Sequence, residues 1–96
     1  MKIINTIDNK ETKSTEIGYR IEDGNGTIIV PEILSNVSGI NEWIGLTLDL
    51  GTYYIKNTKV PSGVTLLKEP IELNITKTTP ITKTLVVNLT KGFELP

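Results

Sequence analysis

The fold is decided by residues 51–64, which read GTYYIKNTKVPSGV. The first part is rich in tyrosine, threonine and isoleucine, residue types that favour extended backbone. Side chains alternate between the two faces of a strand, so Tyr53 and Ile55 are expected on the same face. Residues 61–63, Pro-Ser-Gly, are typical of a turn. The stretch therefore predicts a strand over residues 52–57 that is followed by a tight turn.

Short apolar runs on both sides of this stretch predict further strands. They cover residues 2–7, 17–21, 27–30, 43–48, 71–75 and 85–89. Clusters of Gly, Pro, Asn and Asp separate the runs, as in all-β domains. The clearest is residues 22–26, EDGNG, because Asp-Gly and Asn-Gly readily take the positive φ of a tight hairpin. About seven short strands in 96 residues predict an all-β, Ig-like β-sandwich.

The part of the chain around Pro31 has two interpretations. Pro31 either ends the strand before it or places that strand on a sheet edge, because proline cannot donate a ladder hydrogen bond. Residues 32–41 form either one short helical turn or a loop. Beyond them, alternation predicts that Ile44, Leu46 and Leu48 face the core.

The composition argues against an enzyme. The chain has no cysteine and no histidine, which excludes disulfides and thiolate catalysis and removes the commonest general base and zinc ligand. Paired carboxylates are the only catalytic groups left, and the acidic residues are scattered. A net charge of −1 gives no basic surface for nucleic acid. We therefore predict no catalytic residues, no cofactor, no metal site and no nucleic-acid partner.

Residues 51–64, together with LLKEPI at 66–71, resemble the B-type repeat of collagen-adhesin proteins. This is the Cna-B, or prealbumin-like, domain of Gram-positive pilins and adhesins. Its pattern is Gly-Thr-Tyr-Tyr-x-x-Glu-Thr-x-Ala-Pro-x-Gly-Tyr, followed by a Leu-rich turn and a strand. A weaker match, Thr6-Ile7-Asp8, is similar to the family's opening Lys-Val-Asp. The resemblance implies a prealbumin-like sandwich over residues 1–90.

Many domains of this family carry an isopeptide bond between a Lys in the first strand and an Asn in the last, promoted by a buried Glu. The resemblance places Asn88 at the Asn position, Asn57 at the Glu position and Thr6 at the Lys position. Two of the three groups are absent, and each would be costly to bury without the other. We therefore predict no isopeptide bond, and hydrogen bonding among these three residues instead. In a shifted alignment Lys2 would be the partner, with the Glu still missing.

Residues 91–96, KGFELP, resemble the end of a pilin's last domain, where it runs into the sortase signal Leu-Pro-x-Thr-Gly. Only Leu95 and Pro96 of that signal are present, so the resemblance implies a tail that is cut inside it. The resemblance then implies sortase as a partner and an extracellular protein that is anchored to the cell wall. The opening residues are too short an apolar run for a signal peptide, so the export signal is expected outside this sequence.

Two functions from different classes follow from these patterns. The first is a structural stalk or pilin module, whose partners are neighbouring domains or pilus subunits. The second is an adhesive module that binds host extracellular matrix or a neighbouring subunit through residues 31–42. That segment is rich in apolar side chains, including Ile33, Leu34 and Val37. The plainer interpretation is that these side chains cover the open end of the sandwich.

Overall fold

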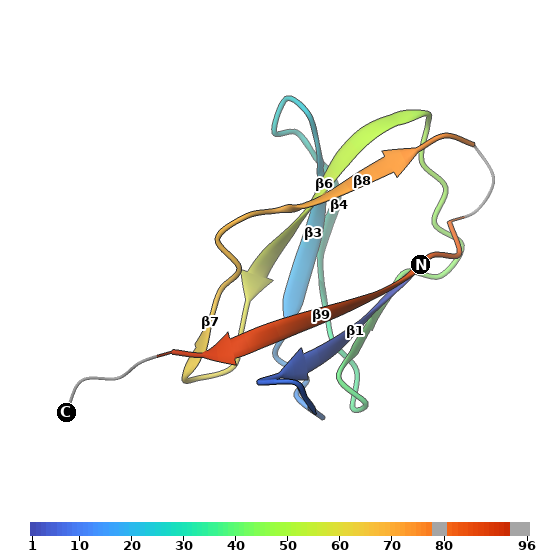
Figure 1. Ribbon diagram of the computed structural model, residues 1–96. Helices are drawn as coiled ribbons and strands as arrows, with labels where there is room; N and C mark the ends of the chain where they lie inside the picture. The colour runs from blue at the N-terminus through green and yellow to red at the C-terminus, as the bar shows by residue number, and fades with distance from the viewer. Residues whose placement is uncertain (78–80, 93–96) are drawn as a thin grey trace.

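The computed structural model describes residues 1–77 and 81–92, which form two packed β-sheets (Figure 1). The strands are β1 (Lys2–Ile7), β2 (Lys10–Glu11), β3 (Gly18–Asp23), β4 (Ile28–Leu34), β5 (Ile40–Glu42), β6 (Gly51–Lys59), β7 (Val64–Thr65), β8 (Ile71–Ile75) and β9 (Thr84–Lys91). The predicted all-β class is confirmed. The strand count exceeds the prediction because β2, β5 and β7 have only two or three residues, too few to show a pattern. No described segment forms a helix long and apolar enough to cross a membrane.

The two sheets differ in how their strands pair. The first has the order β2-β1-β9-β7, with β5 also on β1, and the second has the order β4-β3-β6-β8. β1 and β9 are parallel, from Lys2 opposite Thr84 to Ile7 opposite Leu89. Because the two strands point the same way, the chain enters at one end of the sandwich and β9 points toward the other (Figure 1).

The core lies between the sheets and takes alternate residues from β1, β3, β6, β8 and β9. Ile3, Ile21, Ile55, Leu73 and Leu89 are each at most 2% exposed. Burial of one such side chain contributes about 1.5–3 kcal/mol, so these five positions are a large part of the stability of a small domain. The strand predicted at residues 71–75 is confirmed as β8, in which Leu73 and Ile75 are buried and the residue between them is exposed.

Residues 43–48 do not form the predicted strand. Trp43 and Leu48 are buried, at 6% and 4% exposed, but Ile44 is 90% exposed. The prediction that Ile44 faces the core was wrong. Gly45 has a φ of 68°, so the chain turns there and the two-residue alternation of a strand is lost.

The segment around Pro31 is strand rather than helix. β4 continues through Pro31 to Leu34 and lies on the edge of its sheet, so the second interpretation of Pro31 is correct. The register with β3 shifts between Tyr19 and Ile21, which indicates a bulge in β4 near the proline. Residues 35–39 then connect β4 to β5 without helix, so the loop interpretation holds for these residues, whereas residues 32–34 and 40–41 are strand.

Candidate functional site

Thr6 and Asn88 meet on the outer face of the first sheet. They are register partners in β1 and β9, and the Thr6 hydroxyl donates to Asn88 Oδ1 at 2.9 Å. The backbone N–H of Asn9 donates to the same oxygen at 2.7 Å. Asp8 and Asn9 both have positive φ, of 50° and 64°, so Asn88 holds a sharp turn between β1 and β2. Asn88 is exposed to solvent and Thr6 is half-buried.

Asn57 lies in the other sheet, on β6, and is 6% exposed. Its Nδ2 donates to the carbonyls of Gly18 at 2.9 Å and Lys59 at 3.1 Å. Its Oδ1 accepts the backbone N–H of Leu67 at 3.1 Å. The amide therefore ties β3 and β6 to the segment after β7, and it lies apart from the pair on the first sheet. The structure brings together two of the three positions that the resemblance singled out.

A buried polar cluster that the sequence analysis did not identify lies between the sheets. The Tyr19 hydroxyl donates to Asn5 Oδ1 at 2.7 Å. Asn5 Nδ2 donates to Asn41 Oδ1 at 2.7 Å and to the Gly39 carbonyl at 2.8 Å. Asn5, Tyr19 and Asn41 are at most 2% exposed. The sequence contained part of the information needed to find this cluster, because strand alternation places Asn5 on the same inward face of β1 as Ile3.

The cluster links elements of both sheets. Asn41 Nδ2 donates to the carbonyl of Ile17 at 2.9 Å and to that of Ile33 at 3.2 Å. Burial raises the pKa of Tyr19, because the phenolate would lose its hydration. The hydroxyl therefore stays protonated and remains a donor to Asn5. A fully satisfied buried network of this kind fixes one arrangement of the sheets, and it offers no group for acid–base chemistry near neutral pH.

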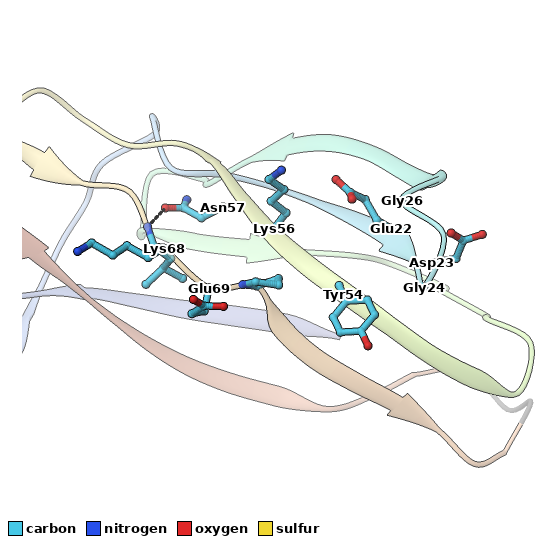
Figure 2. Close-up of a pocket in the computed structure, with 11 residues that line it drawn as sticks. Glu22, Asp23, Gly24, Gly26, Tyr54, Lys56, Asn57, Lys68 and Glu69 are labelled. Carbon is cyan, nitrogen blue, oxygen red and sulfur yellow. Dashed lines mark hydrogen bonds between the residues drawn. The ribbon is translucent and has the colours of Figure 1, made fainter.

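A pocket of about 400 Å³ lies against the second sheet, beside the β3–β4 hairpin (Figure 2). Tyr54 and Lys56 of β6 line it between the hairpin tip and residues 67–70. Three carboxylates and two ammonium groups line the pocket: Glu22, Asp23, Glu69, Lys56 and Lys68. Within the described residues, no group of three or more acidic side chains is placed to hold a metal ion. The lining of the pocket therefore carries charges of both signs.

The segment considered for adhesion is divided between core and solvent. Ile33 packs against the core, and Asn41 is buried. Leu34 and Val37 are 48% and 76% exposed. The segment therefore covers the sandwich over part of its length and leaves a few apolar side chains in solvent. The residues assigned to the sortase signal, Leu95 and Pro96, lie outside the described residues.

Comparison with known proteins shows which family the fold resembles. A family model described as SpaA, a prealbumin-like fold domain, matches residues 2–90. No curated protein sequence matches the chain. A solved variant of BcpA, the major pilin subunit of Bacillus cereus, is 21% identical with a TM-score of 0.69, covering 92% of this chain and 27% of that chain. The Bacillus anthracis TIE protein is 20% identical with a TM-score of 0.72, covering 94% of this chain and 16% of that chain.

A third solved structure is the pilus 2b backbone protein of group B streptococcus. It is 18% identical with a TM-score of 0.64, and the match covers 95% of this chain and 41% of that chain. At these identities the structural likeness shows the fold alone. The chain spans between about a sixth and two fifths of the length of these three proteins.

Proposed function

We infer the function from one premise: this chain belongs to the SpaA family of prealbumin-like fold domains. We propose that it is a structural stalk module of a pilus or other surface protein of a Gram-positive bacterium, without catalytic activity. Two proteins with the same fold are a major pilin subunit and a pilus backbone protein. The proposed partners are neighbouring modules or pilus subunits, and sortase is the enzyme proposed to attach the parent protein to the cell wall.

The parallel pairing of β1 with β9 is the observation that carries this proposal. The molecule measures 48 × 27 × 19 Å along its principal axes, and the two strands run in the same direction through six register pairs. When such a module is pulled through its two ends, β1 and β9 are loaded in opposite directions along the strands. All the hydrogen bonds of the pair then resist together, which suits a module that transmits tension.

The adhesive alternative has less support. It would use the pocket beside the hairpin or the exposed side chains Leu34 and Val37. Apolar patches that mark a binding surface usually reach several hundred Å². Two partly exposed side chains supply less than that, and the pocket lining mixes both signs of charge. Binding to host matrix proteins is therefore not part of the function we propose.

Single-molecule pulling tests the load-bearing role, and the chain has no cysteine to interfere with attachment. Cysteines at Lys2 and Lys91 load the β1–β9 pair in shear. Cysteines at Lys2 and Thr84, which are register partners, load the same pair so that its bonds break one after another. We expect a clearly higher unfolding force for the first geometry. Equal forces, or a lower force in shear, would argue against a stalk role built on this pair.

A further inference from the structure

β9 has a free edge that the proposed function does not use. β1 pairs with it along one side, from Thr84 to Leu89. On its other side β7 pairs only with Thr90 and Lys91. Within residues 1–77 and 81–92, no strand is paired with residues 84–88 on that side (Figure 1). Such an edge presents unpaired backbone groups to any extended chain.

The hydrogen bonds of β1 show which groups are free. The N–H of Lys2 donates to the Lys83 carbonyl at 3.0 Å, and that of Asp8 donates to the Leu89 carbonyl at 2.8 Å. Alternate residues of a strand point their N–H and C=O groups to opposite sides, so the odd-numbered residues of β9 bond to β1. The even-numbered residues, Thr84, Val86 and Asn88, therefore direct theirs toward the free edge.

The other sheet edges carry features that prevent strand pairing. β4 is interrupted by a bulge and Pro31 and carries Glu32. β8 follows Pro70 and carries Glu72, and β2, β5 and β7 have at most three residues. Short strands, proline, charge and bulges are the usual protections of an exposed edge. Residues 84–88, TLVVN, contain no charge and no proline, and Val86 is 69% exposed.

We propose that the free edge of β9 binds a second copy of this chain by antiparallel strand pairing centred on Val86. A two-fold axis at that point would place Val86 opposite its own copy and Thr84 opposite Asn88 of the second copy. No like charges meet in this pairing, and the contact is self-complementary, as two-fold dimers require. The three even-numbered residues would each exchange both backbone hydrogen bonds with the second copy.

The association is expected to be weak and reversible. Five paired residues bury less than the roughly 1,200 Å² of a standard interface. Copies held side by side on one surface would reach a high local concentration, at which weak pairing becomes populated. The inference depends on the edge of β9 alone, so it stands or falls separately from the stalk function.

Sedimentation of the full chain at concentrations up to the millimolar range tests this pairing. We expect a concentration-dependent dimer for the unchanged chain. Val86→Pro removes one N–H at the free edge without removing a donor to β1, and Val86→Lys places like charges opposite each other. Each is expected to weaken dimerisation roughly tenfold or more, because cross-strand contacts at the two-fold axis are lost.

Val37→Lys is the matched control, because Val37 is a valine of similar exposure, 76% against 69% for Val86, that lies outside β9. Circular dichroism checks that each variant is folded, and Val86→Lys carries the test if the proline variant is not. An unchanged chain that stays monomeric overturns the proposal. So does a dimer that Val37→Lys weakens as much as Val86→Lys does.

Discussion

At the scale of single residues, Asn5 is the polar side chain whose replacement should lower the free energy of unfolding most. Replacing it with leucine, which has a similar volume, leaves the Tyr19 hydroxyl and the Asn41 carbonyl oxygen buried without their partner. We expect Asn5→Leu to lower the free energy of unfolding by about 2–4 kcal/mol. Asn88→Ala removes exposed hydrogen bonds and should cost about 1 kcal/mol or less. Urea titrations compare the two, and equal losses would contradict the role assigned to the cluster.

Tyr19 should make stability fall at high pH. Burial raises the pKa of Tyr19 in the folded state above its ordinary value of about 10. Below that pH the hydroxyl is protonated in both states and its contribution is intact. Above it the unfolded chain loses the proton first, so unfolding is favoured by up to about 1.4 kcal/mol per pH unit.

The check on this pH dependence is a series of urea titrations between about pH 9 and about pH 11. Tyr19→Phe should be less stable at neutral pH, because Asn5 Oδ1 loses its donor. Its free energy of unfolding should nevertheless fall less steeply with pH than that of the unchanged chain. Parallel declines in the two proteins would show that Tyr19 does not carry the effect.

At the scale of elements, the turn between β4 and β5 depends on Gly39. Its φ is 73°, and a Cβ there would overlap the backbone carbonyl of Thr12. Gly26 has a φ of 80° but open space around it, so it serves as the control. Gly26→Ala should cost about 1–2 kcal/mol from backbone strain alone. Gly39→Ala should lower the free energy of unfolding by about 1–3 kcal/mol more than Gly26→Ala does, because the backbone must also move. The measurement is thermal unfolding, and similar midpoints for both variants would contradict the close approach of Gly39 to the Thr12 carbonyl.

Strands that are long and have one buried face could be predicted from the sequence, whereas turns and very short strands could not. Alternation located the long strands, such as the one containing Tyr53 and Ile55, because one buried face leaves a period of two. It failed at residues 43–48, where Gly45 turns the chain, and at β5, which is three residues long. The hydrogen bond between Asn5 and Asn41 of β5 therefore could not be predicted, although alternation places Asn5 on the inward face of its strand.

At the scale of the whole molecule, the pairing of β1 with β9 joins residues some eighty positions apart in the chain. No local pattern encodes this contact. The hydrogen bonding expected among Thr6, Asn57 and Asn88 implied that the first and last strands lie close together, but not that they pair in parallel. The structure joins Thr6 and Asn88 by a hydrogen bond, whereas Asn57 lies in the other sheet and bonds to Gly18, Lys59 and Leu67. Asn88 is exposed and Thr6 is half-buried, so this pair is not the polar contact between the sheets. That contact is made by Asn5, Tyr19 and Asn41.

The intact mass of the purified chain is the whole-molecule test of our prediction that no isopeptide bond forms. Bond formation needs a desolvated, neutral amine and a protonated carboxyl, and the exposed side chain of Asn88 offers neither environment. Lys2 is opposite Thr84, four positions along β9 from Asn88, which is about 13 Å in a strand and beyond the reach of a lysine side chain. We therefore expect the mass of the plain sequence. A mass lower by one ammonia, restored in Asn88→Ala, would show that a lysine does reach Asn88 and that the assignment of Thr6 is wrong.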